Sequence, residues 1–236
     1  LLLETRCTAE RFGVTFHVGS QAMEPNRYSE ALTQIGALVV KTGVLLDAID
    51  VGGGFPSVYP DLSPPPLDHY MAAIDSSFDA LNVVETCELM CEPGRALAAE
   101  AGSVILRVEH RRGNTLYLND GAFGSLFDAA QFGFRYPVAL LPTDPRSSED
   151  TEPFVFYGPT CDSFDHMPGP FHLPCSVREG DYIEIGQLGA YGHAMASRFN
   201  GFGRYEEVIL TDRPMLTMYD DGAGRRGGAP TIGLEA

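Results

Sequence analysis

Three apolar segments, each ending in glycine or polar residues, constrain the fold of this chain most strongly. They cover residues 13–20 (GVTFHVGS), 48–56 (AIDVGGGFP) and 83–95 (VVETCELMCEPGR). Between them, residues 27–45 and 67–81 repeat apolar side chains at the spacing of an α-helix. Strands that alternate with helices in this way predict parallel βα units whose strand ends share one rim, as in a (β/α)8 barrel.

After about residue 100 the helical spacing disappears and the chain becomes rich in strand patterns. Residues 103–121 indicate two strands joined by an Arg-Arg-Gly-Asn turn, and further strands are expected at 154–159, 181–187 and 206–211, with a polar loop at 140–153 and a mobile tail at 222–230. We therefore expect an α/β chain with two domains. Residues 1–100 would form the C-terminal part of a (β/α)8 barrel, and residues 101–236 a β-rich barrel or sandwich domain.

Charge and cysteine content exclude several classes of protein. The formal net charge of −16 disfavours nucleic acid and anionic membranes as partners. The sequence has no apolar stretch of the roughly 18 residues that cross a bilayer. The five cysteines lie far apart and show no CxxC spacing, so we expect no disulfide scaffold, no metal site and a reducing, cytoplasmic compartment.

The chain begins with LLLETRC, which has neither an initiator methionine nor the basic start of a signal peptide. We interpret these residues as the tail of a helix and expect a protein whose N-terminal part is absent. An incomplete barrel has open sheet edges, which predicts poor solubility for such a piece.

The three strand ends share groups that bind anions. Ser20 offers a hydroxyl, Gly53 and Gly54 expose backbone N–H groups, and Arg95 carries a fork of donors suited to phosphate. A run of glycines by itself is more often a tight turn. Anion donors at three consecutive strand ends instead predict a phosphorylated ligand at the rim.

Two further side chains belong to the same rim. His17 lies three residues before Ser20 and could cover a flat ring held by that phosphate. Glu92 lies three residues before Arg95 and could bond a ring nitrogen, as proteins do for pyridoxal phosphate. Taken alone, His17 would be a core histidine and Glu92 a salt-bridge partner.

Six motifs occur in the order found in a known family: HVGS (17–20), DVGGGFP (50–56), CEPGR (91–95), NDG (119–121), GPTCD (158–162) and GAYG (189–192). The chain resembles the fold-type III pyridoxal-phosphate decarboxylases of basic amino acids. GPTCD followed by FNGF (199–202) is similar to the ornithine decarboxylase branch. The resemblance covers nearly all of the chain.

The resemblance implies pyridoxal 5′-phosphate as the cofactor. By similarity, Glu92 pairs with the pyridine nitrogen, His17 stacks on the ring, and both count as catalytic residues. The implied cofactor-binding residues are Ser20, Gly53, Gly54, Glu92, Pro93, Gly94, Arg95 and Tyr191. Without the family, Tyr191 would be an aromatic residue of the core beside a strand.

The same resemblance implies roles for the GPTCD loop, which on its own terms could hold a buried cysteine and a capping aspartate. Cys161 would donate a proton to the α-carbon after CO2 has left, a task that suits a thiol. Asp162 would bind the distal ammonium of the substrate. Phe127 and Asp128 align with the family's second substrate-binding carboxylate and its neighbour.

The implied reaction is the decarboxylation of L-ornithine to putrescine and CO2, by an obligate homodimer whose active sites are shared across the two-fold interface. Diaminopimelate decarboxylases carry Cys-Glu-Ser where this chain has Cys-Asp-Ser, which favours a plain diamine substrate. Ornithine and lysine differ by one methylene, worth only about 1–3 kcal/mol. The alternatives are a lysine/ornithine decarboxylase of broader specificity and an inactive regulatory relative of the same fold.

One departure from the family concerns the Schiff-base lysine, which lies on an early barrel strand in the family. The only lysine here is Lys41, in the helical stretch LVVKTGV, where a solvent-exposed surface role is expected. We therefore expect the Schiff-base lysine to lie outside this chain, in an absent N-terminal segment. The alternative is the non-catalytic relative.

Overall fold

The computed structural model describes residues 1–81, 83, 85–144 and 150–219. Contacts divide the chain into two units, which are described separately. The first comprises residues 1–57 and 63–97, and the second comprises residues 58–62 and 98–236. Among the described residues, no helix is both long enough and apolar enough to traverse a bilayer.

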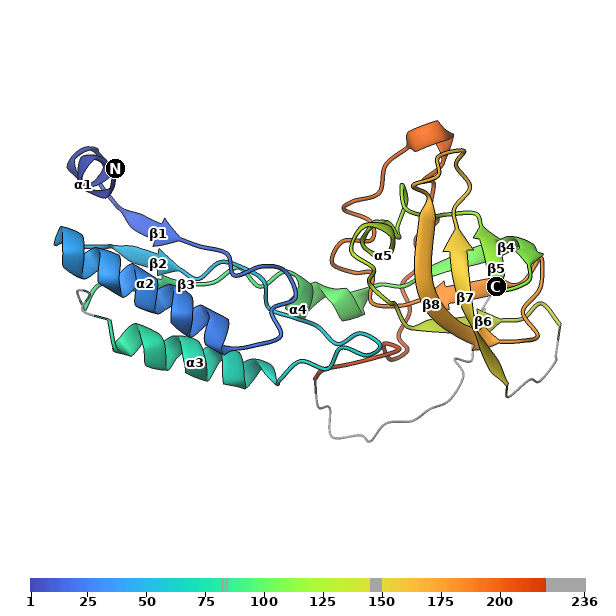
Figure 1. The fold of residues 1–236 in the computed structure, drawn as a ribbon, viewed down its shortest axis with the longest axis horizontal. Helices are drawn as coiled ribbons and strands as arrows, with labels where there is room; N and C mark the ends of the chain where they lie inside the picture. The colour runs from blue at the N-terminus through green and yellow to red at the C-terminus, as the bar shows by residue number, and fades with distance from the viewer. Residues whose placement is uncertain (82, 84, 145–149, 220–236) are drawn as a thin grey trace. The chain divides into compact units, whose positions relative to one another are not determined.

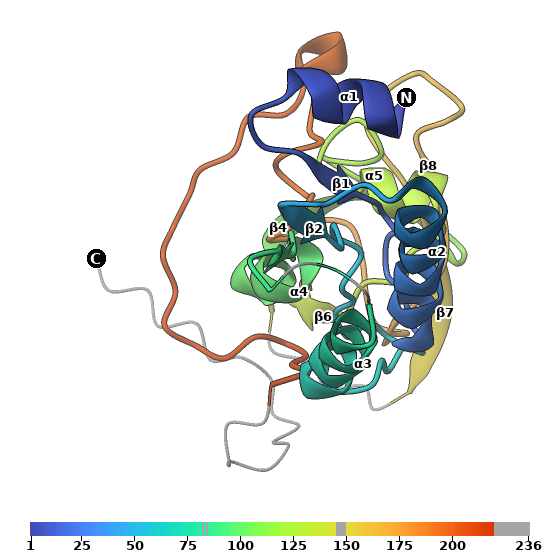
Figure 2. The same ribbon diagram turned by 90° about the vertical axis from the view of Figure 1, so that its left-hand side faces the viewer.

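The first unit is built on a parallel sheet of order β1-β2-β3, formed by β1 (Gly13–Thr15), β2 (Ala48–Asp50) and β3 (Glu88–Met90). Between these strands run α2 (Asn26–Thr42) and α3 (Leu67–Asp79), while α1 (Leu2–Thr8) precedes them. The two long helices lie side by side along the sheet (Figures 1 and 2). This arrangement confirms the parallel βα units expected from the sequence, although each strand is shorter than its apolar segment.

Burial on these helices follows the helical repeat. Tyr28 and Leu32 of α2, and Tyr70 and Ile74 of α3, are the buried positions, each pair four residues apart on one face. They join Phe55 and Ile49 in the core of the first unit. The helix α2 ends at Gly43, whose φ of +66° places it in the left-handed region that glycine tolerates.

The second unit is a mixed sheet of order β6-β9-β4-β5-β7-β8. Its strands are β4 (Val104–Arg112), β5 (Thr115–Leu118), β6 (Val138–Leu141), β7 (Thr151–Tyr157), β8 (His166–Pro174) and β9 (Tyr182–Ile185). The short elements α4 (Arg95–Ala98), η1 (Ala99–Ala101), α5 (Phe127–Gln131) and η2 (Phe199–Gly201) complete the described structure. Its core contains alternate residues of the strands, with the rings of Phe156 and Phe171 stacked 4.1 Å apart.

Several expectations for the second half need correction. Residues 206–211 do not form a strand: Val208, Ile209 and Leu210 are exposed, and none of the described strands pairs with them. The expected loop at 140–153 overlaps β6 and β7. The strand β8 is not predicted from the sequence because its three prolines and its glycine are typical of a turn. The tail at 222–230 lies outside the described residues. The hairpin over 103–121 is confirmed by β4 and β5.

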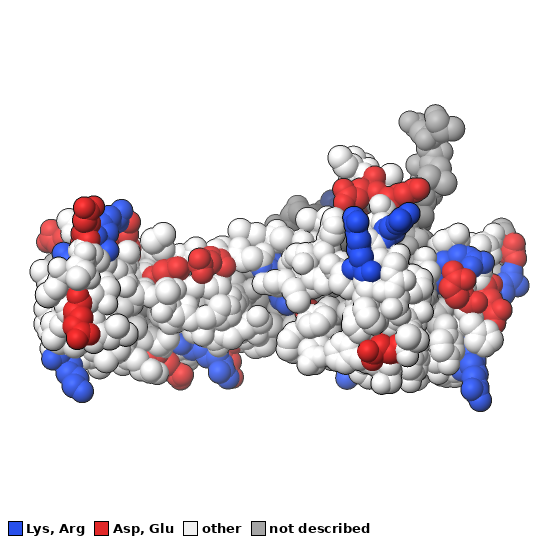
Figure 3. Space-filling view, turned by 90° about the horizontal axis from the view of Figure 1, so that it is seen from above, with Lys and Arg blue, Asp and Glu red and all other residues white. Residues whose placement is uncertain are grey.

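The acidic excess is not gathered into one patch on the face drawn in Figure 3. Acidic and basic side chains are interspersed there, with broad stretches that carry neither. Elsewhere in the described residues, opposite charges form ion pairs such as Arg107 with Glu109, at 2.6 Å. The net charge therefore defines no partner surface on this face, and the functional argument rests on specific loops.

Candidate functional site

The loops that follow β1, β2 and β3 meet at one edge of the parallel sheet. The backbone N–H of Glu92 donates to the carbonyl of Gly52 at 2.8 Å, which joins the third loop to the second. The N–H of Ala22 donates to the carbonyl of Gly54 at 2.9 Å, which joins the first loop to the second. The rim expected from the sequence is therefore formed by three loops in contact.

His17, Gly53 and Glu92 come together at this rim. A Cβ built on Gly53 would lie 3.6 Å from Nε2 of His17 and 2.9 Å from the carbonyl oxygen of Glu92. Any residue larger than glycine would therefore crowd the neighbouring loop. The N–H of Gly19 donates to Nδ1 of His17 at 2.9 Å, so in the neutral ring the hydrogen lies on Nε2.

The remaining phosphate donors predicted from the sequence also follow the strands. Ser20 is exposed and comes directly after Gly19, whose carbonyl oxygen leaves no room for a Cβ on Gly54. Gly54 has a φ of +96°, which also requires glycine. Pro93 is half-buried, Gly94 is exposed, and Arg95 is buried at the start of α4.

Two buried tyrosines support the rim from the core. The hydroxyl of Tyr28 donates to the carbonyl of Gly53 at 3.0 Å, and that of Tyr70 donates to the carbonyl of Ala22 at 2.8 Å. Burial raises the pKa of Tyr70 to about 12. Burial, followed by the nearby Tyr70, raises the pKa of Tyr28 as well. Both hydroxyls therefore stay protonated donors at neutral pH.

Gln21 fastens the first loop to the second. Its side-chain Nε2 donates to the carbonyl of Ser57 at 2.5 Å, and its Oε1 accepts from the N–H of Ser57 at 3.1 Å. The backbone of Gln21 has a φ of +56°, an uncommon conformation for this residue type. The loop that carries Ser20 is thus held immediately beyond that serine.

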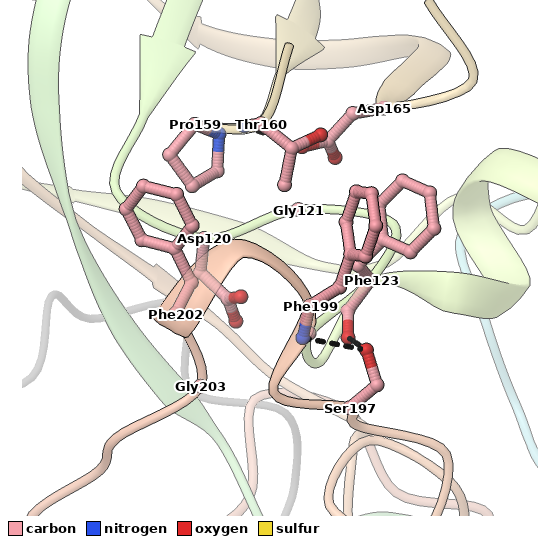
Figure 4. Close-up of a pocket in the computed structure, with 11 residues that line it drawn as sticks. Asp120, Gly121, Phe123, Pro159, Thr160, Asp165, Ser197, Phe199, Phe202 and Gly203 are labelled. Atoms are coloured by element: carbon pink, nitrogen blue, oxygen red, sulfur yellow. Dashed lines mark hydrogen bonds between the residues drawn. The ribbon is translucent and has the colours of Figure 1, made fainter. Parts of the chain in front are cut away.

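A separate pocket lies in the second unit, where three segments meet. Its space is about 190 Å³, including the open mouth. It is lined by Asp120, Gly121, Phe123 and Gly124 after β5, by Pro159, Thr160 and Asp165 around the loop after β7, and by residues of the segment 197–203. Figure 4 shows the rings of Phe123, Phe199 and Phe202 around it, with the carboxylate of Asp120 between them.

Buried carboxylates hold the pocket together. Asp165 accepts from the N–H of Ala122 at 2.7 Å and from the N–H of Thr160 at 3.0 Å. A Cβ on Gly121 would lie 2.6 Å from the Cα of Gly158 and would overlap the carboxylate of Asp165. The glycines of NDG and GPTCD are therefore required because the two loops pack directly against each other.

Asp120 is a second buried carboxylate, and it joins segments on the other side of the pocket. Its Oδ2 accepts from the backbone N–H of Ser125 at 3.0 Å, from the hydroxyl of Ser125 at 2.6 Å and from the hydroxyl of Tyr205 at 3.1 Å. Burial and the Asp120 carboxylate raise the pKa of Tyr205. Tyr205 therefore remains a donor to the carboxylate at neutral pH.

Cys161 and Asp162 lie at the exposed tip of the loop between β7 and β8, so the alternative of a buried cysteine is wrong. The thiol accepts a hydrogen bond from Nδ2 of Asn200 at 3.6 Å. Oδ1 of Asp162 accepts from the N–H of Phe164 at 2.9 Å. A carboxylate offers about four lone-pair positions, so this bond leaves capacity for a ligand ammonium.

The other predicted residues of the second unit lie on neighbouring elements. Asp128 is buried on α5, and Phe127 beside it contacts Phe132 edge-on, with ring centroids 6.2 Å apart. The helix α5 follows the turn that Asp165 joins to the Cys161 loop. Tyr191 is 38% exposed in the turn after β9, so its side chain is not a core aromatic.

The sequence did not indicate the lining residues Asp120, Phe123, Asp165, Ser197 and Phe202, nor Asn200, which contacts the thiol of Cys161. The motifs NDG and FNGF contained some of them, but their side chains were given no role. Asp165 had a recognisable signal, since it is an acid inside the apolar stretch FVFYGPTCDSFDHM. Among the described residues, no group of three or more His, Cys, Asp or Glu side chains is placed to hold a metal ion.

Comparison with known proteins identifies the family that this chain resembles. Residues 7–99 match the family model described as the pyridoxal-binding domain of pyridoxal-dependent decarboxylases. Over these residues the chain belongs to this family of pyridoxal-dependent decarboxylases. The match contains every predicted residue of the strand-end rim, from His17 to Arg95.

Individual relatives extend the similarity beyond residue 99. The ornithine decarboxylase of Panagrellus redivivus is 31% identical over 86% of this chain and 51% of its own length. The lysine/ornithine decarboxylase of Vibrio vulnificus, solved with putrescine, is 35% identical with a TM-score of 0.67, covering 84% of this chain and 54% of that one. The diaminopimelate decarboxylase of Helicobacter pylori, solved with L-lysine, is 27% identical with a TM-score of 0.69, covering 84% and 50%. The chain spans about half the length of the curated relatives that it matches.

Proposed function

We propose that this protein decarboxylates L-ornithine to putrescine and CO2, with pyridoxal phosphate as cofactor. The observation that carries the proposal is the contact of the three strand-end loops, which gathers His17, Gly53 and Glu92 at one rim. Relatives that act on ornithine, on lysine and ornithine, and on diaminopimelate support the broader class of basic amino-acid decarboxylase.

The rim fits the proposed cofactor in its shape and in its donors. Gly53 and Gly54 keep the backbone accessible where any side chain would clash, and an exposed hydroxyl and a guanidinium lie on the flanking loops. Ser20, Gly54, Gly94 and Arg95 would bind the phosphate, with Gly53 and Pro93 in the same loops. Tyr191 of the second unit would add a hydroxyl donor to it.

The ring would be held by His17 on its face and by Glu92 at its nitrogen. When bound, the cofactor supplies an electron sink for the charge left on the α-carbon as CO2 departs. The carboxylate of Glu92 would keep a proton on the ring nitrogen. The hydrogen bond from the N–H of Gly19 to Nδ1 restrains the His17 ring, which supports the proposed stacking.

The second unit would supply the acid and the substrate contacts. Cys161 would donate its proton to the α-carbon, and its exposed position at a loop tip suits a residue that meets substrate. Asp162 and Asp128 would bind the distal ammonium of ornithine, with Phe127 packing beside its methylenes. Two carboxylates around one ammonium would strengthen substrate binding and would select substrates by the length of their side chain.

The proposed architecture is the C-terminal part of a (β/α)8 barrel over residues 1–100, followed by a β-rich domain over residues 101–236. The parallel strands with intervening helices and the mixed sheet support these two parts. We further propose a homodimer in which the loop that carries Cys161 completes the active site at the cofactor rim of the partner subunit. Its exposed thiol and carboxylate support this, because both lie at a loop tip.

The direct test offers carboxyl-labelled L-ornithine, L-lysine and meso-diaminopimelate separately to the protein with pyridoxal phosphate. Labelled CO2 should be released fastest from ornithine, with putrescine as the product. Equal release from ornithine and lysine would indicate the broader lysine/ornithine specificity. Release from diaminopimelate alone would contradict the proposed substrate.

A second candidate function is that of an inactive regulatory relative of the same fold, which would bind the cofactor but act on polyamine synthesis through its surface. Lys41, on the exposed side of α2, is assigned no role in the cofactor site. Cofactor binding without CO2 release from any of the three amino acids would favour this function.

A further inference from the structure

The segment that carries Asn200 is anchored firmly to the turn after β5. The N–H and hydroxyl of Ser197 both donate to the carbonyl of Phe123, at 2.8 and 3.0 Å. The ring of Phe199 packs on that of Phe123 with centroids 4.4 Å apart. Figure 4 shows these two rings together at the pocket, beside the bonds of Ser197. The segment therefore has a fixed position against the body of the second unit.

Asn200 has a backbone conformation that is uncommon outside glycine. Its φ is 54° and its ψ is 18°, in the left-handed region, where asparagine is one of the few tolerated residue types. From this position Nδ2 reaches Sγ of Cys161 at 3.6 Å, a contact between residues 39 positions apart. A left-handed residue at the tip of an anchored turn thus places an amide donor on the thiol.

The loop of Cys161 is fixed independently of Asn200. The N–H of Thr160 donates to Asp165, and the N–H of Asp162 donates to the hydroxyl of Thr160 at 3.4 Å. These bonds hold the backbone on both sides of Cys161, but neither reaches its sulfur. Among the described residues, Asn200 provides the hydrogen bond to Sγ.

We propose that Asn200 is a positioning residue for Cys161, an inference that rests on the proposed role of Cys161 as proton donor. When the thiol gives its proton to the α-carbon, the S–H bond breaks, a C–H bond forms, and the electron pair stays on sulfur. An amide N–H binds an anionic sulfur more strongly than a neutral thiol. Asn200 thus aims the thiol and stabilises the charge that develops as the proton leaves.

The contact can be tested without cofactor or substrate, by the rate at which iodoacetamide alkylates Cys161 at a fixed pH near neutrality. Peptide mapping separates Cys161 from Cys7, an exposed thiol that serves as an internal reference. Asn200→Asp keeps the size of the side chain but replaces the donor by a carboxylate. Asn200→Gly removes the amide and tolerates the left-handed backbone.

Since alkylation requires the thiolate, Asn200→Asp should slow it at Cys161 by about tenfold, as expected for one hydrogen bond to a charged group, and leave Cys7 unchanged. Asn200→Gly should slow it several-fold, and the control Asn26→Asp, at an exposed position of α2, should change neither thiol. Unchanged alkylation of Cys161 in both Asn200 variants would overturn the contact.

The catalytic part of the proposal has its own readout. Asn200→Asp should lower kcat for ornithine by about tenfold while KM stays within about twofold, because the bond acts as the proton is transferred. Slower alkylation with unchanged kcat would overturn the positioning role. Failure of the wild-type protein to release CO2 would count against the proposed function, and the alkylation rates would still decide whether Asn200 controls the thiol.

Discussion

The buried carboxylate of Asp165 accepts a hydrogen bond from the backbone N–H of Ala122 at 2.7 Å, across 43 positions of sequence. Its other oxygen accepts from the N–H of Thr160 at 3.0 Å. One side chain therefore joins the turn after β5 to the loop that carries Cys161. The position of the thiol depends on a carboxylate that would not itself meet the substrate.

Replacing Asp165 by asparagine should destabilise the second unit. The substitution turns an NH2 group toward one of the two backbone donors, which leaves a buried N–H unsatisfied at a cost of about 1–3 kcal/mol. Urea denaturation followed by circular dichroism measures this change. Asp162→Asn, at the exposed tip of the same loop, is the matched control and should shift the midpoint little. Equal midpoints for both variants would show that Asp165 does not hold the loops together.

Tyr70 should make stability fall at alkaline pH. Its pKa is raised to about 12 in the folded protein by burial, above the ordinary value of 10.0. The protonated form is therefore favoured by folding, so this contribution is present below pH 10 and is lost as pH rises toward 12. The free energy of unfolding of Tyr70→Phe should decline less steeply over this range than that of the wild type. An identical decline in both proteins would contradict the assignment.

Asp47 should make the stability of the folded protein fall at acid pH. The N–H of Phe12 and the guanidinium of Arg6 donate to its carboxylate at 2.7 and 2.5 Å, and they lower its pKa below the ordinary 3.8. Folding thus favours the ionised carboxylate. The stability that Asp47 contributes is therefore complete above its ordinary pKa of 3.8 and is lost as the pH falls below its lowered pKa in the folded protein. Asp47→Asn should lose less stability than the wild type between pH 4 and pH 2 in denaturant titrations, and a parallel loss would be inconsistent with this pairing.

Much of the first unit could be predicted because its signals are local. Helical spacing of apolar residues in α2 and α3, and glycines after β2, follow from backbone geometry over a few residues. The second unit was harder because its strands are defined by long-range pairing. The strand β8 contains Gly169 between two prolines, whereas residues 206–211 have the composition of a strand but no partner strand among the described residues.

The residues of the two sites also differ in how far they could be predicted from the sequence. Residues of the rim follow their strands directly, so their order in the sequence indicated their place. Asp165 and Phe199 reach the pocket from separate segments, and only folding reveals that the amide of Asn200 meets the thiol of Cys161. The glycines of NDG and GPTCD have a physical explanation only once the two loops are seen in contact.

If the three strand-end loops bind the phosphate of one cofactor, substitutions in these loops should weaken the equilibrium binding of pyridoxal phosphate to this chain. Ser20→Ala and Arg95→Ala should each weaken binding by about 10- to 100-fold, as expected for hydrogen bonds to a charged group. Ser76→Ala and Arg27→Ala, at exposed helical positions, should leave the Kd unchanged. Pyridoxal without its phosphate should bind far more weakly. Equal affinity for pyridoxal and pyridoxal phosphate, with no effect of either rim substitution, would show that these loops do not bind the phosphate.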